Sequence, residues 1–153
     1  MVEDARYRTK VFLEAYLENE NITLDNGETQ ATVLVCYANP PYPLTRLFSV
    51  DGKNVDVMIT VDTPESKPML DVAKYTIGYI EHIPVTINCV DKTGITATNL
   101  RWKAETELRR IVEEHPFGSL RIWSVMKPQD VRLEGSMVIH RVTYVLMYMR
   151  DTT

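Results

Sequence analysis

The longest regular pattern of hydrophobic and polar positions runs from Thr76 to Val90, where the two kinds of side chain alternate. Successive side chains of a β-strand point to opposite faces, so this run predicts one long strand with a buried face. Pro84 lies inside it and has no N–H to donate, which predicts an edge position, a bulge or a bend there. The predicted buried face carries Ile77, Tyr79, Ile83, Val85, Ile87 and Cys89, and the other face carries Thr76, His82, Thr86 and Asn88, with Ile80 and Val90 as exceptions.

Two segments show apolar residues at helical spacing instead. Residues 4–19 predict an amphipathic helix, and residues 98–114 predict a longer one whose narrow apolar stripe needs a sheet to lie on. Pro116 and Gly118 follow the second helix and predict its end. The stripes consist of Tyr7, Val11, Phe12, Ala15 and Tyr16 in the first helix, and of Leu100, Ala104, Leu108, Ile111 and Val112 in the second.

Shorter strand signals fill the rest of the chain. Asp51-Gly52 is a two-residue signal for a type I′ turn, so it predicts a hairpin between the strands that flank it. Thr-Pro-Glu-Ser-Lys-Pro opens a segment that we expect to be an exposed loop, residues 63–74, and a second polar loop is expected at 127–135. The remaining predicted strands are 29–37, 46–50, 53–62, 119–126 and 136–150.

This order of elements predicts a single α+β domain over residues 1–153, with a mostly antiparallel sheet and the two main helices packed on one face. The last strand raises a physical difficulty, because its residues are apolar on both faces. Its second face must be covered either by the domain's own loops or by another subunit, and both remain open at this point. The seven methionines suit an interface, since Met tolerates imperfect packing.

Charge and composition exclude some classes of protein. A formal net charge of −4 argues against a dedicated nucleic-acid binder, whose affinity comes from Lys and Arg that neutralise phosphates. No apolar run approaches the roughly 20 residues that span a bilayer, and the start, MVEDARYRTK, lacks the apolar centre of a secretory signal. We therefore expect no membrane contact and an origin in the cytoplasm.

The two cysteines and three histidines show no spacing typical of a metal site. Cys36 and Cys89 lie in apolar strand-like runs and are expected to be buried reduced thiols, with a disulfide or a reactive thiol as alternatives. His82, His115 and His140 are scattered, with no HxH, HxxxH or HExxH pattern. No metal or cofactor is expected from these residues.

Catalytic motifs are also missing from the sequence. It holds no GxSxG nucleophile elbow, and neither of the two glycine-rich phosphate loops, GxGxxG and GxxxxGK[ST]. We therefore predict that the chain is not an enzyme. The alternative is an enzyme with a dispersed site, for which His82, His140, Cys36 and Asp62 are the residues to test.

The second predicted helix has a charged outer face. Arg101-Trp102-Lys103 and Arg109-Arg110 alternate with glutamates, and pairs such as Glu105–Arg109 have i,i+4 spacing, which favours a salt-bridged surface over a nucleic-acid surface. Trp102 lies off the apolar stripe. It is a candidate anchor for a partner, or it folds onto the edge of the sheet.

The last seventy residues carry a recognisable pattern. The runs IPVTINCVDKTG, TATNLRWKAETELRRIV and GSLRIWSVMKPQDVRLEGSMVIHRVTYVLMYMR read as strand, helix, strand, polar loop and strand. This pattern resembles the tail-terminator and tail-completion proteins of long-tailed phages, and the related head–tail joining proteins. The resemblance covers residues 83–150, and the first eighty residues match only loosely. Its most telling part is the close, LEGSMVIHRVTYVLMYMR.

The resemblance implies a structural virion protein. Copies of the chain would form a ring, a hexamer by analogy, at the head-proximal end of the tail, where it stops growth of the tail tube and joins the tail to the neck. The implied partners are other copies of the chain, the tail-tube protein and a neck or connector protein, and DNA would pass through the lumen without specific binding. The alternative is a non-viral binding or accessory module.

Within this reading we expect three contact regions and one anchor. The regions are the hairpin at Asp51 and Gly52, the loop 63–74 with Glu65 and Lys67, and the exposed face of residues 144–150. The anchor is Trp102. The interface residues predicted on the last strand are Tyr144, Tyr148 and Arg150.

Overall fold

The fold is taken from a computed structural model that describes residues 5–18, 22, 31–38, 49–50, 53–90, 97–115, 119–132 and 138–151. The predicted hairpin turn, Asp51 and Gly52, lies outside the described residues. So do Pro116 and Gly118, which were expected to end the second helix.

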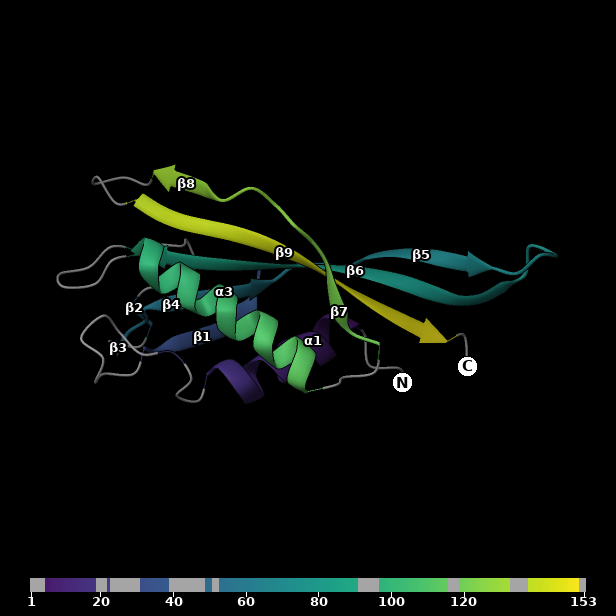
Figure 1. The fold of residues 1–153 in the computed structure, drawn as a ribbon, viewed down its shortest axis with the longest axis horizontal. Helices are drawn as coiled ribbons and strands as arrows, with labels where there is room; N and C mark the ends of the chain where they lie inside the picture. Colours follow the sequence, from purple (N-terminus) through teal and green to yellow (C-terminus); the bar gives the residue numbers. More distant parts are fainter. Residues whose placement is uncertain are drawn as a thin grey trace.

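A seven-stranded sheet forms the centre of the molecule (Figure 1). The main strand order is β1-β4-β6-β9-β7, while β5 pairs with β6 and β8 pairs with β9. The β1–β4 pair is parallel and the other pairs of this sheet are antiparallel, so the predicted mostly antiparallel sheet is confirmed. Its strands are β1 (Val33–Tyr37), β4 (Val57–Val61), β5 (Glu65–Leu70), β6 (Thr76–Val90), β7 (Arg121–Val125), β8 (Gln129–Arg132) and β9 (Val138–Asp151).

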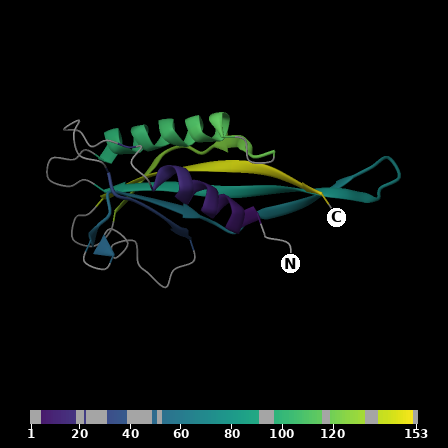
Figure 2. The same cartoon turned by 90° about the horizontal axis from the view of Figure 1, so that it is seen from below.

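Both helices lie on the same face of this sheet, as predicted. Helix α1 spans Ala5–Leu17 and helix α3 spans Ala97–Glu114, each within two residues of its expected bounds. Helix α3 buries its predicted stripe in one core cluster with β1, β4, β6 and β9 (Figures 1 and 2). Helix α1 joins this cluster through Ala5, Phe12, Leu13 and Leu17, so the stripe predicted for it is wrong at Tyr7 and Val11, which are 47% and 45% exposed. Fully buried residues of this cluster include Leu13, Leu17, Leu100, Leu108 and Ile111.

A second, smaller cluster covers part of the opposite face. Ile139 of β9 is fully buried there against Val55, Met58 and Val90, with Leu34 and Cys36 packed beside them. Because Val142, Tyr144 and Leu146 belong to the helix-side core, β9 is buried on both faces over this part of its length. The chain's own residues therefore provide the cover here, which was one of the two alternatives.

The predicted hairpin at 46–62 is divided in the structure. Strands β2 (Ser49–Val50) and β3 (Lys53–Asn54) pair antiparallel as a separate two-stranded sheet, while β4 belongs to the main sheet. Between them the buried carboxylate of Asp56 accepts a hydrogen bond from the Thr32 N–H at 2.8 Å, which ties the start of β4 to β1. The second strand is therefore broken before β4.

Two predicted loops contain strands, and both predictions are corrected. Residues 63–74 hold β5, which pairs with the first half of β6, and residues 127–135 hold β8, which pairs with β9. Both strands are exposed or polar along most of their length, so neither gives the alternation that marks a half-buried strand. Their partners, rather than their own patterns, determine that they are extended.

Strand β6 has the predicted bounds, but Pro84 does not make it an edge strand. On one side β6 pairs with β9 along its whole length, and on the other it pairs first with β5 and then with β4. Pro84 lies between those two partners, where its carbonyl accepts the Asp62 N–H at 2.9 Å. In an antiparallel strand, the N and O of one residue face the same neighbouring strand. The N–H that Pro84 lacks would therefore point to the junction between β5 and β4.

Candidate assembly surfaces

The first candidate surface is a hairpin arm, which we define as residues 65–82. It consists of β5, a turn and the first half of β6, and it extends past both helices (Figures 1 and 2). Its turn is held by hydrogen bonds from the Tyr75 N–H to the Asp71 carboxylate at 2.9 Å and from the Lys74 N–H to the Asp71 carbonyl at 3.0 Å. Lys74 takes a left-handed φ of 66°. The arm is thus a formed ribbon rather than the loop that the sequence predicted.

The end of the arm is apolar and exposed. Four large side chains, which we call the arm tip, are more than half exposed: Leu70 at 53%, Val72 at 104%, Tyr75 at 72% and Ile77 at 52%. Scattered exposed apolar residues are normal on a protein surface, whereas several gathered on one projection mark an interaction site. The arm tip is therefore the strongest candidate for a contact with another molecule.

The foot of the arm is fixed to the C-terminal strand. The Arg150 guanidinium donates to Glu81 at 3.2 Å and lies 4.6 Å above the Tyr79 ring, and Ser66 donates to the same Glu81 carboxylate at 3.2 Å. Arg150 was predicted as a contact residue, but its interactions inside the fold hold the arm against β9. Its guanidinium therefore has a positioning role for the arm.

The second candidate surface lies on the sheet face away from the helices. Trp123, Met126 and Met149 form what we call the open-face patch, and Trp123 is 60% exposed. The Trp123 ring lies 5.4 Å from the His82 ring, next to the ladder pair His82–Met147. Two of the three residues of this patch are methionines, whose flexible side chains tolerate imperfect packing.

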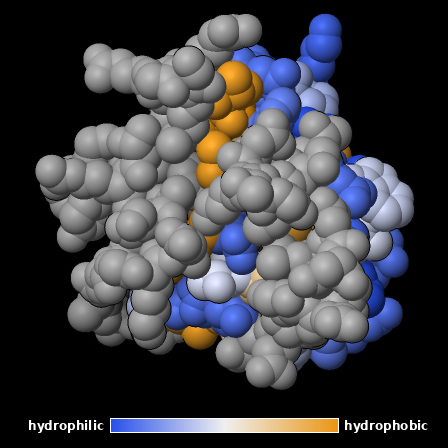
Figure 3. Space-filling model, turned by 90° about the vertical axis from the view of Figure 1, so that its left-hand side faces the viewer, coloured by the Kyte–Doolittle hydropathy of each residue, from blue (hydrophilic) through white to orange (hydrophobic). Residues whose placement is uncertain are grey.

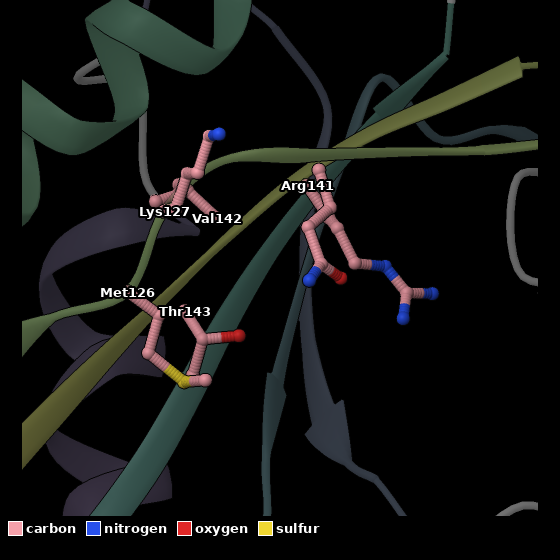
Figure 4. Close-up of a pocket in the computed structure, with 6 residues that line it drawn as sticks. Met126, Lys127, Arg141, Val142 and Thr143 are labelled. Atoms are coloured by element: carbon pink, nitrogen blue, oxygen red, sulfur yellow. The ribbon is translucent and has the colours of Figure 1, made fainter.

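A small pocket adjoins the open-face patch (Figure 4). Its volume is about 30 Å³, room for about one water molecule, whereas sites for small-molecule ligands measure about 300–1,000 Å³. The Arg141 Nε at this place is buried without a hydrogen-bond partner among the described residues. The pocket is lined by Met126, Lys127, Gln129, Arg141, Val142 and Thr143.

The end of the molecule opposite the arm has a different character. Its described surface is mainly hydrophilic, with a narrow strip of apolar side chains (Figure 3).

Three predicted contact residues are exposed as expected. Glu65 and Lys67 lie on the outer strand of the arm with most of their side chains in solvent, and Trp102 is 63% exposed on α3. Trp102 therefore does not fold onto the sheet. Their role in contacts stays a prediction.

Tyr144 and Tyr148 require correction. Tyr144 is fully buried, and its hydroxyl donates to the Glu105 carboxylate at 2.7 Å, so it belongs to the core and presents nothing to a partner. Tyr148 is half-buried against the same core and accepts a hydrogen bond from Arg8 at 2.8 Å. The reason is register, because the residues of β9 with even numbers face the helices.

Tyr144 is part of a buried polar network between α3 and β9. Burial, helped by the hydrogen bond to Glu105, raises the pKa of the Tyr144 hydroxyl. Glu105 is also close to Arg101, at 3.4 Å, in place of the predicted pair with Arg109. The expected salt-bridged outer face of α3 is present at Arg110, which pairs with Glu107 and Glu114, each at 2.8 Å.

The two cysteines lie on opposite faces of the sheet. Cys89 belongs to the helix-side core and Cys36 packs against the second cluster, so they cannot form a disulfide with each other in this fold. Burial raises the pKa of the Cys89 thiol to about 12 and also raises that of Cys36. Both are free thiols, as expected, although Cys36 is only half-buried.

The two histidines proposed for a dispersed catalytic site lie far apart. His140 pairs with Cys89 across the β6–β9 ladder, which places it seven residues, or about 24 Å, along the sheet from His82. His140 also contacts Asp130 at 2.6 Å on the helix side, whereas His82 contacts Trp123 on the open face. Within the described part of the chain, no three His, Cys, Asp or Glu residues are placed to hold a metal ion.

Sequence reasoning chose residues 63–74 as a contact region but did not single out the apolar residues of the arm tip. Leu70, Val72 and Tyr75 are spaced two and three residues apart, so no single hydrophobic period connects them. One signal was available, because Ile77 and Tyr79 extend the alternation of β6 well beyond the residues that the helices cover.

Among the described residues, no helix is long and apolar enough to cross a membrane. No protein-family model matches the chain, and no curated protein does.

Proposed function

We propose that this chain is a structural virion protein whose copies assemble into a ring at the head-proximal end of the tail of a long-tailed phage. The ring ends the growth of the tail tube and joins the tail to the neck. Its partners are other copies of the chain, the tail-tube protein and a neck or connector protein, and the phage DNA passes through its lumen.

The observation that carries this proposal is the hairpin arm with its exposed apolar tip. An exposed apolar tip on a projecting ribbon costs solubility, and a partner that buries the tip offsets that cost. A chain whose role is assembly needs such a surface.

Two further features support the proposal. The resemblance of residues 83–150 to tail-terminator and tail-completion proteins names the kind of assembly. The net charge of −4 suits a lumen through which DNA must slide, because an acidic wall does not trap phosphates.

Growth of tail tubes in vitro tests this function. Tail-tube protein from the same phage is polymerised with and without the chain, and tube lengths are measured by negative-stain electron microscopy. We expect shorter tubes, with a ring at one end, when the chain is present.

A variant with Val72→Ser and Tyr75→Ser provides the control, since both residues are exposed and their replacement leaves the core intact. It is expected to fold normally but to leave tube length unchanged. If the unaltered chain neither shortens the tubes nor binds their ends, the proposed function is wrong.

A further inference from the structure

The arm tip needs an acceptor, and a ring restricts what that acceptor can be. Cyclic assemblies are built from heterologous contacts, in which one patch of a subunit meets a different patch of the next. We propose that the open-face patch around Trp123 binds the arm tip of the neighbouring copy. This inference rests on the proposed self-assembly and names the two surfaces that meet.

The foot of the arm borders the open-face patch of its own chain, but the arm tip lies away from Trp123, the centre of that patch. His82 contacts Trp123, and Thr76 lies six residues further along β6, which at about 3.4 Å per residue is a distance of about 20 Å. The arm is a paired ribbon with its foot anchored by Arg150, so it does not fold back. The tip can therefore meet this patch only on another molecule.

The contact must use side chains rather than strand addition. The outer strand of the arm, β5, carries Lys67 and Pro68, and a proline and an exposed lysine both hinder the pairing of an edge strand. Strand β7 has a register shift between Ile122 and Ser124, which also interrupts a straight edge. A contact between the apolar arm tip and the aromatic, Met-rich patch uses side chains alone, so neither β5 nor β7 has to pair along its edge.

The charges of the two surfaces are complementary. Residues 65–82, which form the arm, contain Glu65, Asp71 and Glu81 against Lys67 and Lys74, a balance of −1. Residues 119–128, which include β7, contain Arg121 and Lys127 and no carboxylate, a balance of +2. Opposite charge around an apolar contact favours this pairing and disfavours arm against arm.

Crosslinking with engineered cysteines tests the contact. One protein carries Val72→Cys in the arm tip and the other carries Ser124→Cys beside Trp123, both in a Cys36→Ala background. Cys89 is fully buried and does not react. A short bis-maleimide is expected to give a covalent dimer when the two proteins are mixed and little dimer from either protein alone. Thr106→Cys, an exposed position on α3, replaces Ser124→Cys in the control and is expected to give no dimer.

Paired tryptophan variants provide a second readout. Trp123→Ala removes the centre of the patch and is expected to weaken self-association at least tenfold in sedimentation, since buried aromatic residues dominate interface energies. Trp102→Ala removes an equally exposed tryptophan on the helix side. Since the proposed contact between copies does not use this side, its predicted role as an anchor would concern the tail tube or the neck, and self-association is expected to be unchanged.

The outcomes separate the two proposals. If the chain forms an oligomer but the mixed proteins give no dimer, or if Trp102→Ala weakens association as much as Trp123→Ala, the arm-to-patch contact is wrong while self-assembly stands. A Val72→Cys chain that crosslinks only to the tail-tube protein also overturns it. If the chain is monomeric under all conditions, both proposals are wrong.

Discussion

The hydroxyl of Tyr144 and the carboxylate of Glu105 meet 2.7 Å apart between β9 and α3, where both residues are buried. A buried carboxylate that loses a donor keeps the cost of its lost hydration. Tyr144→Phe is therefore expected to lower the free energy of unfolding by about 1–3 kcal/mol. Thermal unfolding measures this, with Tyr75→Phe at the exposed arm tip as the matched control. Equal melting temperatures for the two variants would contradict the assigned network.

The same tyrosine predicts a dependence of stability on pH. Burial raises the pKa of Tyr144 in the folded state, while the unfolded chain ionises near the usual value of about 10. Above that pH the unfolded state releases a proton that the folded state retains, so stability falls as pH rises. We expect this alkaline loss to be smaller in Tyr144→Phe, measured by urea unfolding between about pH 9 and 11. An equal loss in both proteins would exclude the effect.

The two thiols are expected to differ in reactivity. The thiolate is the reactive form, and burial of Cys89 raises its pKa to about 12. In the native protein at neutral pH, a thiol reagent should modify only Cys36, and slowly, while Cys89 should react only after unfolding. Ellman's reagent measures both rates, and Cys36→Ala should show no reactive thiol before unfolding. Rapid reaction of two thiols in the native chain would show that Cys89 is not in the core.

At the scale of elements, Gly78 marks the point in the arm where β6 extends past the end of β9. A Cβ at this position would lie 2.9 Å from the Arg150 carbonyl oxygen and 2.7 Å from the Met69 methyl group. Met69 has a flexible end that can move, but the backbone of β9 cannot do so easily. Gly78→Ala is expected to cost about 1–3 kcal/mol. Amide hydrogen exchange in the arm should be faster in Gly78→Ala than in a Thr76→Ala control. Equal protection of the arm in the two variants would contradict this close approach.

Helix α3 contributes to stability through its buried stripe. Leu108 is fully buried, so Leu108→Ala is expected to lower the free energy of unfolding by about 2–5 kcal/mol, from lost burial and the cavity left behind. Glu113→Ala on the exposed side of the same helix should change it by less than about 0.5 kcal/mol. Chemical denaturation measures both, and a small effect of Leu108→Ala would place the stripe away from the core.

Elements with a strong local pattern could be predicted, and those formed by pairing could not. The alternation from Thr76 to Val90 and the stripe of α3 are local features, and the structure confirms the bounds of the strand, its buried face from Ile83 to Cys89 and the whole stripe of α3. Ile77, also predicted on the buried face, is exposed because it lies in the arm, which extends past the helices. Strands β5 and β8 have exposed or polar sequences whose extended form depends on β6 and β9. The parallel pairing of β1 with β4 likewise depends on contacts between distant residues, which no local pattern reveals.

The candidate surfaces follow the same rule. Trp102 was found from the sequence because it lies off a clear helical stripe. Tyr144 was misplaced because β9 is apolar on both faces, and only the register with β6 shows which residues face the helices. Trp123 was not singled out because its role depends on the fold, which brings β7 beside His82 on the open face.

At the scale of the whole molecule, the distribution of apolar surface is uneven. The helix-side face is closed by α1 and α3, and the other face is closed near Ile139 by the second cluster. Of the twelve large apolar residues that are exposed in the described part of the chain, seven belong to the arm tip or the open-face patch. The others are Tyr7, Val11, Tyr37, Trp102 and Val125. A subunit with two unlike apolar surfaces is suited to head-to-tail assembly, which forms a ring when the rotation between neighbours closes.

The central claim is that the arm drives assembly, and sedimentation velocity of the unaltered chain beside the Val72→Ser, Tyr75→Ser variant tests it most directly. The account predicts that the unaltered chain sediments as one closed oligomer, alone at high concentration or on tail tubes, while the variant stays monomeric with an unchanged melting temperature. A monomeric unaltered chain, with and without tubes, or a variant that assembles equally well, would contradict it.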